Sequence, residues 1–456
     1  MATQYEIDLA LMAGRAYYDT RTDINRFPVP DGWTEFFHVP NATFPSSSGL
    51  EAVSFQRGDE IVISYAGTGP GLNQDWWANF GLYTGLGADQ FREAALYYLQ
   101  VKEANPNATI SFTGHSLGGG LAALLGVFFD EKAVTFDQAP FGSSVSTGMR
   151  DDLISYLNGH GYDNSALSQI APELLAFSNE NLAARHANVS GLYVEGEILS
   201  EWSSSMIGVQ TPLLHGSTDV SGSNLHAQSL LTAFVENDQF REVTNKLTDL
   251  LGMIFDKNLY FRDPNKLTNP EVNLLEHLIR HQEGLDPAVP NDGDHMLDRF
   301  TTDLWKIAQD GGLTMANNDL TKALTAFAMQ AYYFNRPESD ATLFDAETGG
   351  IHFDRMDVAD TLDGDTGAKG YTMYFSKYLD TLPAEDRDLI VAQLPNLLDW
   401  YIQAGTQAMT ATAGTQRAFM LGGSGDDTLT GGSQADLLVG NGGAGDNNDW
   451  NWRMAA

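Results

Sequence analysis

The sequence contains no cysteine, so it forms no disulfide, has no thiolate metal site and has no cysteine nucleophile. Basic residues are scarce as well. Lys and Arg number 25 against 60 Asp and Glu, which gives a formal net charge of −35. A surface this negative repels the phosphates of nucleic acids and of anionic membranes, so nucleic-acid binding is not expected.

Long apolar runs are also missing. The longest extends from Leu121 to Phe129, whereas a helix needs about 20 apolar residues to cross a bilayer, so no transmembrane segment is predicted. The segment from Met1 to Tyr18 carries Glu6 and Asp8 where a secretory signal has a basic part and then an apolar one. No cleaved N-terminal signal is therefore expected.

Short β-rich runs alternate with helical ones up to about residue 235. The predicted strands cover residues 51–55, 60–65, 108–113, 133–136 and 189–194. Apolar residues at helical spacing indicate helices at 88–103 and 117–129. Strands separated by helices predict an α/β fold, with a mostly parallel sheet covered by helices on both faces.

The remaining chain divides into two further regions. Residues 236–415 have helical periodicity with few β-rich runs, and we expect a mainly helical region that acts as a cap or a spacer. Residues 416–456 are rich in Gly, Asp, Asn and Leu and hold the internal repeat of the sequence. The predicted domains are therefore 1–235, 236–415 and 416–456.

Residues 109–120 read TISFTGHSLGGG, a β-branched strand followed by a glycine-flanked serine and a helical run. A nucleophile on a sharp strand-to-helix turn adopts a strained backbone conformation that only small neighbours tolerate, which explains Gly114 and Gly118. The N-terminal amides and the dipole of the following helix favour negative charge that develops beside Ser116. The pattern predicts Ser116 as a catalytic nucleophile.

Three segments resemble the successive landmarks of class 3 lipases within the α/β-hydrolases. They are YAGT at 65–68 followed by Asp75-Trp76, GHSLGG at 114–119, and AVTFDQAP at 133–140. The resemblance covers roughly residues 40–235 and implies ester hydrolysis through an acyl-enzyme on Ser116. Ala66 stands where the family usually has arginine, but the hydroxyl residue Thr68 is kept.

Two hydrogen-bond donors must face the substrate carbonyl oxygen as it becomes an oxyanion. The amide of Leu117 is one by its position after the nucleophile, and the resemblance makes Thr68 the other. We expect the general base at His226, in a polar loop that leads into an apolar helix after the last predicted strand. His215 is the alternative base.

The acid that orients the histidine is less well defined. The family pattern puts it at the end of the strand at 189–194, which favours Glu197; a glutamate serves there because its longer side chain still reaches the imidazole. Asp137, Glu195 and Asp219 stay open as alternatives.

Three aromatic residues follow the predicted oxyanion segment, namely Trp76, Trp77 and Phe80. Aromatic side chains near a nucleophile are typical of an acyl-binding surface or a lid. Packing at the start of a helix is the alternative interpretation.

The glycine-rich tail has a repeat of nine residues. Residues 422–430 read GGSGDDTLT, which fits the pattern G-G-x-G-x-D-x-U-x with Asp427 as ligand and Leu429 as inward residue. The next unit keeps Asp436, and the third has Asn447 where Asp belongs. The tail resembles calcium-binding RTX repeats in a short parallel β-roll. That resemblance implies structural calcium at Asp427 and Asp436 and export by a type I system. Because the segment after the repeats is short, we expect a truncated array.

Together these patterns predict a secreted serine carboxylic ester hydrolase of lipase type that cleaves acylglycerols without a catalytic cofactor. A phospholipase A1 acting on glycerophospholipids is the alternative substrate class. A calcium-dependent surface or adhesive protein with a decayed hydrolase domain is the alternative of another class. The tail from 416 holds 5 acids against 2 bases, so the acidity is spread over the chain and favours neutral or zwitterionic esters.

Overall fold

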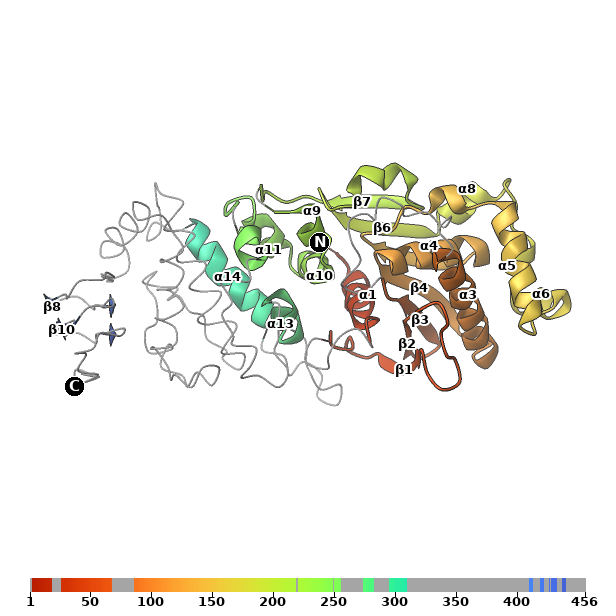
Figure 1. Cartoon of the computed structure of the whole chain (residues 1–456), viewed down its shortest axis with the longest axis horizontal. Helices are drawn as coiled ribbons and strands as arrows, with labels where there is room; N and C mark the ends of the chain where they lie inside the picture. The colour runs from red at the N-terminus through yellow and green to blue at the C-terminus, as the bar shows by residue number, and fades with distance from the viewer. Residues whose placement is uncertain are drawn as a thin grey trace. The chain divides into compact units, whose positions relative to one another are not determined.

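The computed structural model (Figure 1) describes residues 2–18, 26–67, 86–218, 220–248, 250–255, 274–282, 295–309, 410–412, 419–421, 426, 428–432 and 437–439. The chain forms two compact units. The first comprises Met1–His215, Val220–Arg241 and Ile279–Gly293, and the second comprises Gly216–Asp219, Glu242–Leu278 and Asp294–Ala456. The domain division at residues 235 and 415 stays a prediction.

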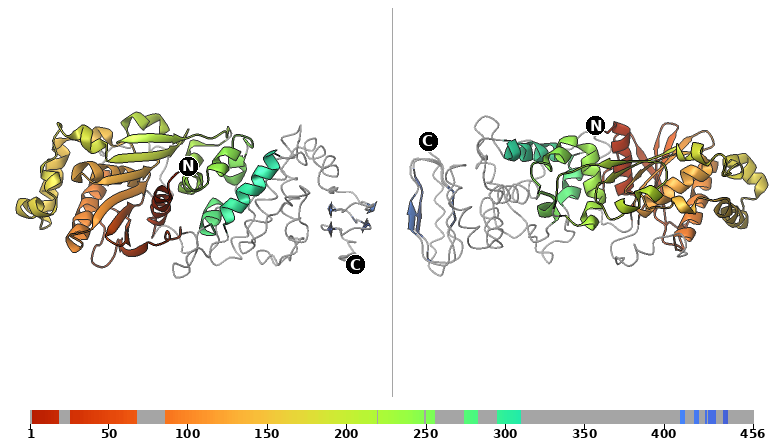
Figure 2. Two further views of the ribbon diagram at one scale, coloured as in Figure 1. Left: turned by 180° about the vertical axis from the view of Figure 1, so that it is seen from behind. Right: turned by 90° about the horizontal axis from the view of Figure 1, so that it is seen from above.

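The first unit contains a seven-stranded mixed sheet whose strands lie side by side in chain order (Figure 2). The strands are β1 (Thr34–Val39), β2 (Ala52–Arg57), β3 (Glu60–Tyr65), β4 (Thr109–His115), β5 (Lys132–Phe136), β6 (Val189–Val194) and β7 (Val209–Leu213). The pairs β1–β2 and β2–β3 are antiparallel, and every later pair is parallel. The predicted α/β class with a mostly parallel sheet is confirmed.

Helices precede the sheet, connect its strands and follow it. They are α1 (Gln4–Arg15), α3 (Leu86–Ala104), α4 (Leu117–Phe129), α5 (Thr147–Gly159), α6 (Asn164–Ile170), α7 (Pro172–Leu175), α8 (Leu182–His186), α9 (Gly222–Leu225), α10 (Gln228–Glu236), α11 (Asp238–Val243), α12 (Leu250–Phe255), α13 (Leu274–Arg280) and α14 (Met296–Gln309), with 3₁₀ turns at η3 (Gly142–Ser144) and η4 (Ser200–Ser205). Of the helices that the structure describes, none combines the length and apolar character needed to cross a lipid bilayer.

Strand β4 carries helices on both of its faces, as its alternating side chains require. Ile110 and Phe112 join the apolar core with α3 and α4, where the rings of Tyr98 and Phe112 lie 5.1 Å apart. Ser111 and Thr113 point to the other face, where they hydrogen-bond to Tyr5 Oη (3.1 Å) and to the backbone oxygen of Leu9 (3.5 Å) in α1. The strand that precedes Ser116 is therefore buried on both sides.

Helix α1 begins at a complete capping box, in which Thr3 and Glu6 satisfy each other's backbone amides. It packs against β4 and against α10, and Figure 1 shows α1 and α10 next to each other. Gln228 Nε2, on α10, donates to the backbone oxygen of Ala10 at 3.0 Å. The start of the chain thus supports the helix that directly follows the loop of His226.

The structure has strands and helices at the positions predicted for this unit. It also has the strands β1 and β7, which were not predicted. β7 reads VQTPL, contains Pro212, and lies at one edge of the sheet with Val209 69% exposed. An edge strand with exposed side chains needs no alternation of apolar and polar residues. Proline is tolerated there because no strand on the open side requires the N–H that proline lacks. Hydrophobic periodicity therefore gave no signal for it.

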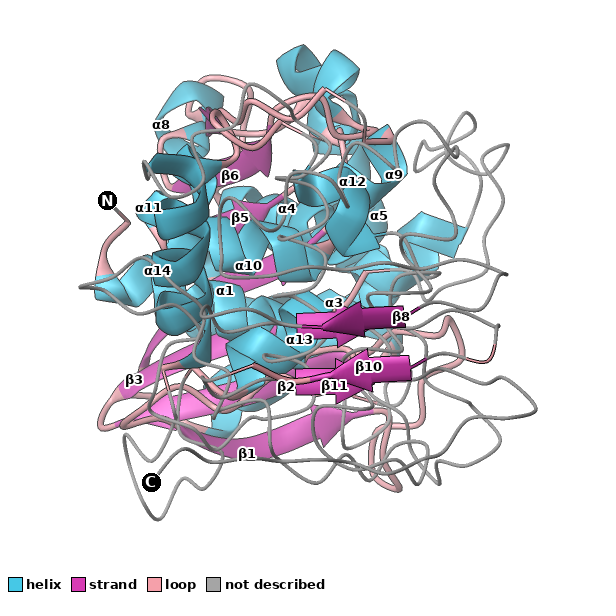
Figure 3. Cartoon of the chain, turned by 90° about the vertical axis from the view of Figure 1, so that its left-hand side faces the viewer, coloured by secondary structure: helices cyan, strands magenta, loops and turns pink. Residues whose placement is uncertain are grey.

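The described residues of the tail form four short strands, β8 (Thr410–Thr412), β9 (Phe419–Leu421), β10 (Thr428–Thr430) and β11 (Leu437–Val439). Each begins nine residues after the previous one, and each pairs in parallel with the strand two places away, β10 with β8 and β11 with β9 (Figure 3). Leu429 is half-buried between exposed Thr428 and Thr430. β8 precedes the predicted tail boundary at 416. That boundary was based on the glycine motif, which β8 does not carry.

Candidate active site

Ser116 lies on the sharp turn between β4 and α4. Its backbone adopts φ 60° and ψ −124°, a conformation that costs a non-glycine residue about 1–3 kcal/mol. The turn is held by neighbouring backbone groups: the Ser116 amide donates to the Phe136 oxygen (2.9 Å), and the Ala139 amide donates to the Ser116 oxygen (3.0 Å). The strain is thus supported by β5 and the segment after it.

The glycines on either side of Ser116 are required by close packing. A Cβ on Gly118 would lie 2.0 Å from the Tyr65 backbone oxygen, and a Cβ on Gly114 would lie 2.5 Å from the Gly118 carbonyl carbon. A Cβ on Gly67 would lie 3.1 Å from the Cβ of Ser116. The end of β3 therefore runs directly against the nucleophile turn, as the predicted oxyanion segment requires.

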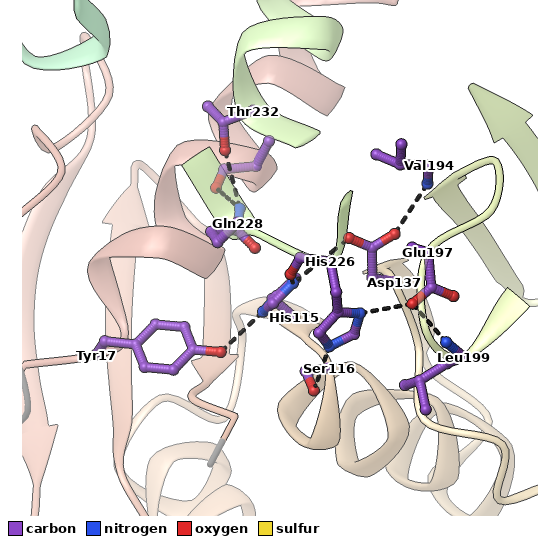
Figure 4. A network of polar contacts seen from close by, with 11 residues as sticks. Tyr17, His115, Ser116, Asp137, Val194, Glu197, Leu199, His226, Gln228 and Thr232 are labelled. Atoms are coloured by element: carbon purple, nitrogen blue, oxygen red, sulfur yellow. Dashed lines mark hydrogen bonds and ion pairs between the residues drawn. The ribbon is translucent and has the colours of Figure 1, made fainter. Parts of the chain in front are cut away.

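His226 directly follows the short helix α9 and brings its ring to Ser116 (Figure 4). Its Nε2 lies 2.8 Å from Ser116 Oγ, and its Nδ1 lies 2.7 Å from Glu197 Oε2. A carboxylate oxygen only accepts, so Nδ1 carries the proton and Nε2 is free to accept from the serine hydroxyl. All three side chains are buried, with Glu197 only 1% exposed.

Glu197 is held rigidly in the turn that follows β6. Its amide donates to the Val194 oxygen at 3.1 Å, and its Oε2 accepts from the Leu199 amide at 2.7 Å as well as from His226. Among the described residues, none hydrogen-bonds to its second oxygen, Oε1. Oε2 thus accepts two hydrogen bonds: the one from the Leu199 amide holds the carboxylate, and the one from His226 orients the imidazole.

The alternative acids and the alternative base lie elsewhere. The Glu195 side chain is exposed, and its backbone oxygen contacts His215 Nε2 at 2.9 Å, so this pair is an exposed loop contact. Asp137 is fully buried, but its contacts are to the Val194 amide (2.9 Å) and His115 Nε2 (3.5 Å). Asp219 lies outside the described residues.

Asp137 is electrostatically strained as well as buried. It has the left-handed φ of 44° at the end of β5. Burial of the carboxyl, and then the nearby charge of Glu197, raise the pKa of Asp137 well above its usual range, and the hydrogen bond from Val194 only partly opposes this. Asp137 and Glu197 thus both lie close to the His226 imidazole, and Glu197 accepts the hydrogen bond from its Nδ1.

The oxyanion and substrate positions are described only in part. Leu117 is the first residue of α4, so its amide has no acceptor within the helix and lies at the positive end of the helix dipole. The predicted donor Thr68 and the predicted substrate residues Trp76, Trp77 and Phe80 lie outside the described residues.

Two residues of the site were missed by sequence reasoning. Tyr17 Oη lies 2.8 Å from His115 Nδ1, and His115 Nε2 lies 3.0 Å from the backbone oxygen of His226. His115 occupies the variable position of the G-x-S-x-G motif, and Tyr17 follows a helix that starts the chain. Neither position has a local pattern that points to its hydrogen-bond partner, which is 98 residues away for Tyr17 and His115 and 111 residues away for His115 and His226.

Within the part of the chain that the structure describes, His115, Asp137 and His226 have the chemistry of a metal site. One ligand atom from each lies within 4.8 Å of the others. Each of these side chains is hydrogen-bonded to a neighbour in the site: His115 to the His226 oxygen, Asp137 to the Val194 amide and His226 to Glu197. The metal ligands predicted from the repeats, Asp427 and Asp436, lie outside the described residues.

Comparison with known proteins identifies the domain that carries this geometry. Residues 9–240 match the Phospholipase-like family, described as the Tle-like phospholipase domain. The chain belongs to this family. The Tle-like phospholipase domain starts within α1 and ends within α11, so it includes the sheet, Ser116, Glu197 and His226.

The chain is similar over part of its length to curated relatives and to solved structures. Extracellular phospholipase A1 of Serratia liquefaciens is 33% identical over 100 residues, which make up 22% of this chain and 30% of that protein. Lip2 lipase from Yarrowia lipolytica is 14% identical with a TM-score of 0.29, covering 48% of this chain and 81% of that one. The Rhizomucor miehei lipase propeptide complex is 13% identical with a TM-score of 0.30, covering 46% and 69%.

Proposed function

We propose that this protein is a serine carboxylic ester hydrolase that cleaves lipids through an acyl-enzyme on Ser116. The observation that carries the proposal is the continuous hydrogen-bonded chain from Ser116 Oγ through His226 to Glu197, built on a strained strand-to-helix turn. Nucleophile, acid and base follow one another in the chain order typical of α/β-hydrolases. The Tle-like phospholipase domain supports a lipid substrate.

In the acylation step, Ser116 Oγ attacks the ester carbonyl carbon while His226 Nε2 takes the hydroxyl proton. Glu197 stabilises the imidazolium that forms. The carbonyl oxygen becomes an oxyanion beside the Leu117 amide, and Thr68 is proposed as its second donor. The intermediate then collapses, the bond from carbon to the alcohol oxygen breaks, and His226 returns the proton to the leaving alcohol.

Deacylation repeats the same steps with water. His226 Nε2 removes a proton from the water that attacks the acyl carbon, and the Ser116 oxygen leaves with that proton. The products are a free fatty acid and the restored hydroxyl. Every proton in the cycle passes through one nitrogen atom, and none of these steps uses a metal.

Two further observations support a substrate class. The family description and the name of the Serratia relative support glycerophospholipids, with phospholipase A1 specificity, over the acylglycerols that the lipase resemblance favoured. The net charge of −35 favours a zwitterionic headgroup over an anionic one. The same relative supports an extracellular location, for which the type I route remains the proposed mechanism.

We expect a fluorophosphonate to label the wild-type protein at Ser116 and not to label the Ser116→Ala variant. On vesicles of 1-palmitoyl-2-oleoyl-phosphatidylcholine, palmitate should be released faster than oleate, and faster than fatty acid from a triolein emulsion. Phosphatidylglycerol vesicles should be cleaved more slowly at low salt, with the difference reduced at high salt.

Faster release from triolein would assign the protein to acylglycerols instead. Absence of both labelling and fatty-acid release would contradict the proposed activity altogether. That outcome would favour the surface or adhesive protein with a decayed hydrolase domain.

For the tail we propose a calcium-binding parallel β-roll. Its support is the spacing of nine residues between β8, β9, β10 and β11 and the parallel pairing of strands two repeats apart. Asp427 and Asp436 would supply the carboxylate oxygens that calcium prefers. The ion would neutralise the acidic turns and so stabilise the stacked strands.

Millimolar calcium is expected to raise the melting temperature of the tail in the full-length protein, compared with the same protein in a chelator. The effect should be lost in the double variant Asp427→Asn, Asp436→Asn, and Asp426→Asn is the matched control because Asp426 is exposed and not at the ligand position. Circular dichroism with temperature provides the measurement. An equal calcium effect in both variants would contradict this site.

A further inference from the structure

A second layer of buried polar groups lies behind the three triad side chains (Figure 4). It consists of Tyr17, His115 and Asp137, and we call it the supporting network. Tyr17 is 7% exposed, His115 is 5% exposed and Asp137 is fully buried. The steps of ester cleavage described above assign no role to these three residues.

The chemistry of the acceptors fixes the direction of the hydrogen bonds. The backbone oxygen of His226 only accepts, so His115 Nε2, 3.0 Å away, carries the proton that it donates. In the neutral ring Nδ1 is then an acceptor, and Tyr17 Oη donates to it at 2.8 Å. Tyr17 thereby selects the His115 tautomer that holds the His226 backbone.

The supporting network reaches both partners of the nucleophile. Through His115 it fixes the backbone of His226, whose ring centroid lies 4.8 Å from that of His115. Through Asp137 it fixes the end of β6, since Asp137 Oδ1 accepts from the Val194 amide, and the Val194 oxygen receives the Glu197 amide. Asp137 Oδ2 lies 3.5 Å from His115 Nε2, so the two branches are adjacent at this point.

We propose that Tyr17, His115 and Asp137 are positioning residues that hold His226 and Glu197 in register with Ser116. This inference rests on the proposed function, because it assigns the network a role in the same reaction. A buried carboxyl whose pKa is raised by burial and by Glu197 costs stability. Its presence beside the triad is therefore better explained by positioning than by stability.

The test compares two replacements of His115. His115→Leu fills similar space without a donor, whereas His115→Gln places an amide N–H2 near the position of Nε2 and restores the bond to the His226 oxygen. We expect His115→Leu to lower kcat per active site about 100-fold with KM unchanged, because small displacements of a catalytic group have effects of this order. His115→Gln should recover most of that loss.

Active sites are counted by fluorophosphonate titration, so a loss of folded protein does not register as a loss of kcat. Tyr17→Phe, which removes one hydroxyl, provides a milder variant should His115→Leu fail to fold, and we expect its labelling rate to fall about tenfold, the factor that corresponds to about 1.4 kcal/mol. His160→Leu is the matched control, since His160 is an exposed residue at the end of α5.

The outcomes separate this inference from the proposed function. If the wild-type protein is not labelled, the proposed function itself fails. If the wild type is labelled and Tyr17→Phe and His115→Leu are labelled at the same rate per site, the supporting network has no role in catalysis. Equal loss in His115→Gln and His115→Leu would also overturn the proposal, because the restored donor would then be irrelevant.

Discussion

Replacing Ser116 with alanine is expected to lower kcat on a phospholipid ester about 10⁶-fold and to leave KM nearly unchanged. The hydroxyl forms the bond to the acyl carbon, and the variant retains the oxyanion donors and the binding surface. What remains should be slow attack by water. Ser111→Ala is the matched control, because Ser111 lies on the same strand and faces α1 instead of the site.

The triad should behave as one unit in this experiment. His226→Ala is expected to lose about as much activity as Ser116→Ala, and the double variant no more than either alone, since a serine without its base is hardly better than water. Stopped or discontinuous assays of fatty-acid release measure these rates. Losses that multiply in the double variant, or a Ser116→Ala variant with a tenth of wild-type activity, would contradict the assigned roles.

Glu197→Ala is expected to lower kcat about 10⁴-fold. The change removes both the charge that stabilises the imidazolium and the acceptor that receives Nδ1–H at 2.7 Å. Glu197→Gln separates the two effects: its amide oxygen is able to take the place of Oε2, which already accepts from the Leu199 amide at 2.7 Å. The glutamine variant should therefore lose less activity than the alanine variant.

Glu195→Ala is the control for this series, because Glu195 is exposed and lies only two residues earlier. Its kcat should match the wild type. A larger loss in Glu195→Ala than in Glu197→Ala would show that the loop is rearranged during catalysis. Equal losses in Glu197→Gln and Glu197→Ala would show that the charge alone matters.

Local chemistry made the nucleophile region predictable from sequence. Strain at Ser116 requires small neighbours, and those neighbours are visible as Gly114 and Gly118 between a β-branched strand and an apolar helix. The expected helix over 117–129 has the bounds of α4. The candidate acids were harder to separate, because burial decides between them and burial is not written in the spacing of Asp137, Glu195 and Glu197.

Contacts between distant segments were beyond sequence reasoning. Tyr17 belongs to the site only because α1 packs on β4, and no local pattern specifies that packing. The tail shows the converse. A glycine motif revealed the units that begin at 422 and 431, whereas β8 and β9 follow the same spacing of nine residues without it. Their place in the β-roll is defined by strand pairing, which a single sequence does not display.

The packing of α1 against α10 has a consequence for the order of events during synthesis. The bond from Gln228 to the Ala10 oxygen joins residues that are 218 positions apart, and the bond from His226 to Ser116 joins residues 110 apart. Contacts so distant along the chain form slowly, because a long loop must close first. A nascent chain will therefore carry its nucleophile strand well before it has a general base. Hydrolytic competence should appear as one of the last steps of folding.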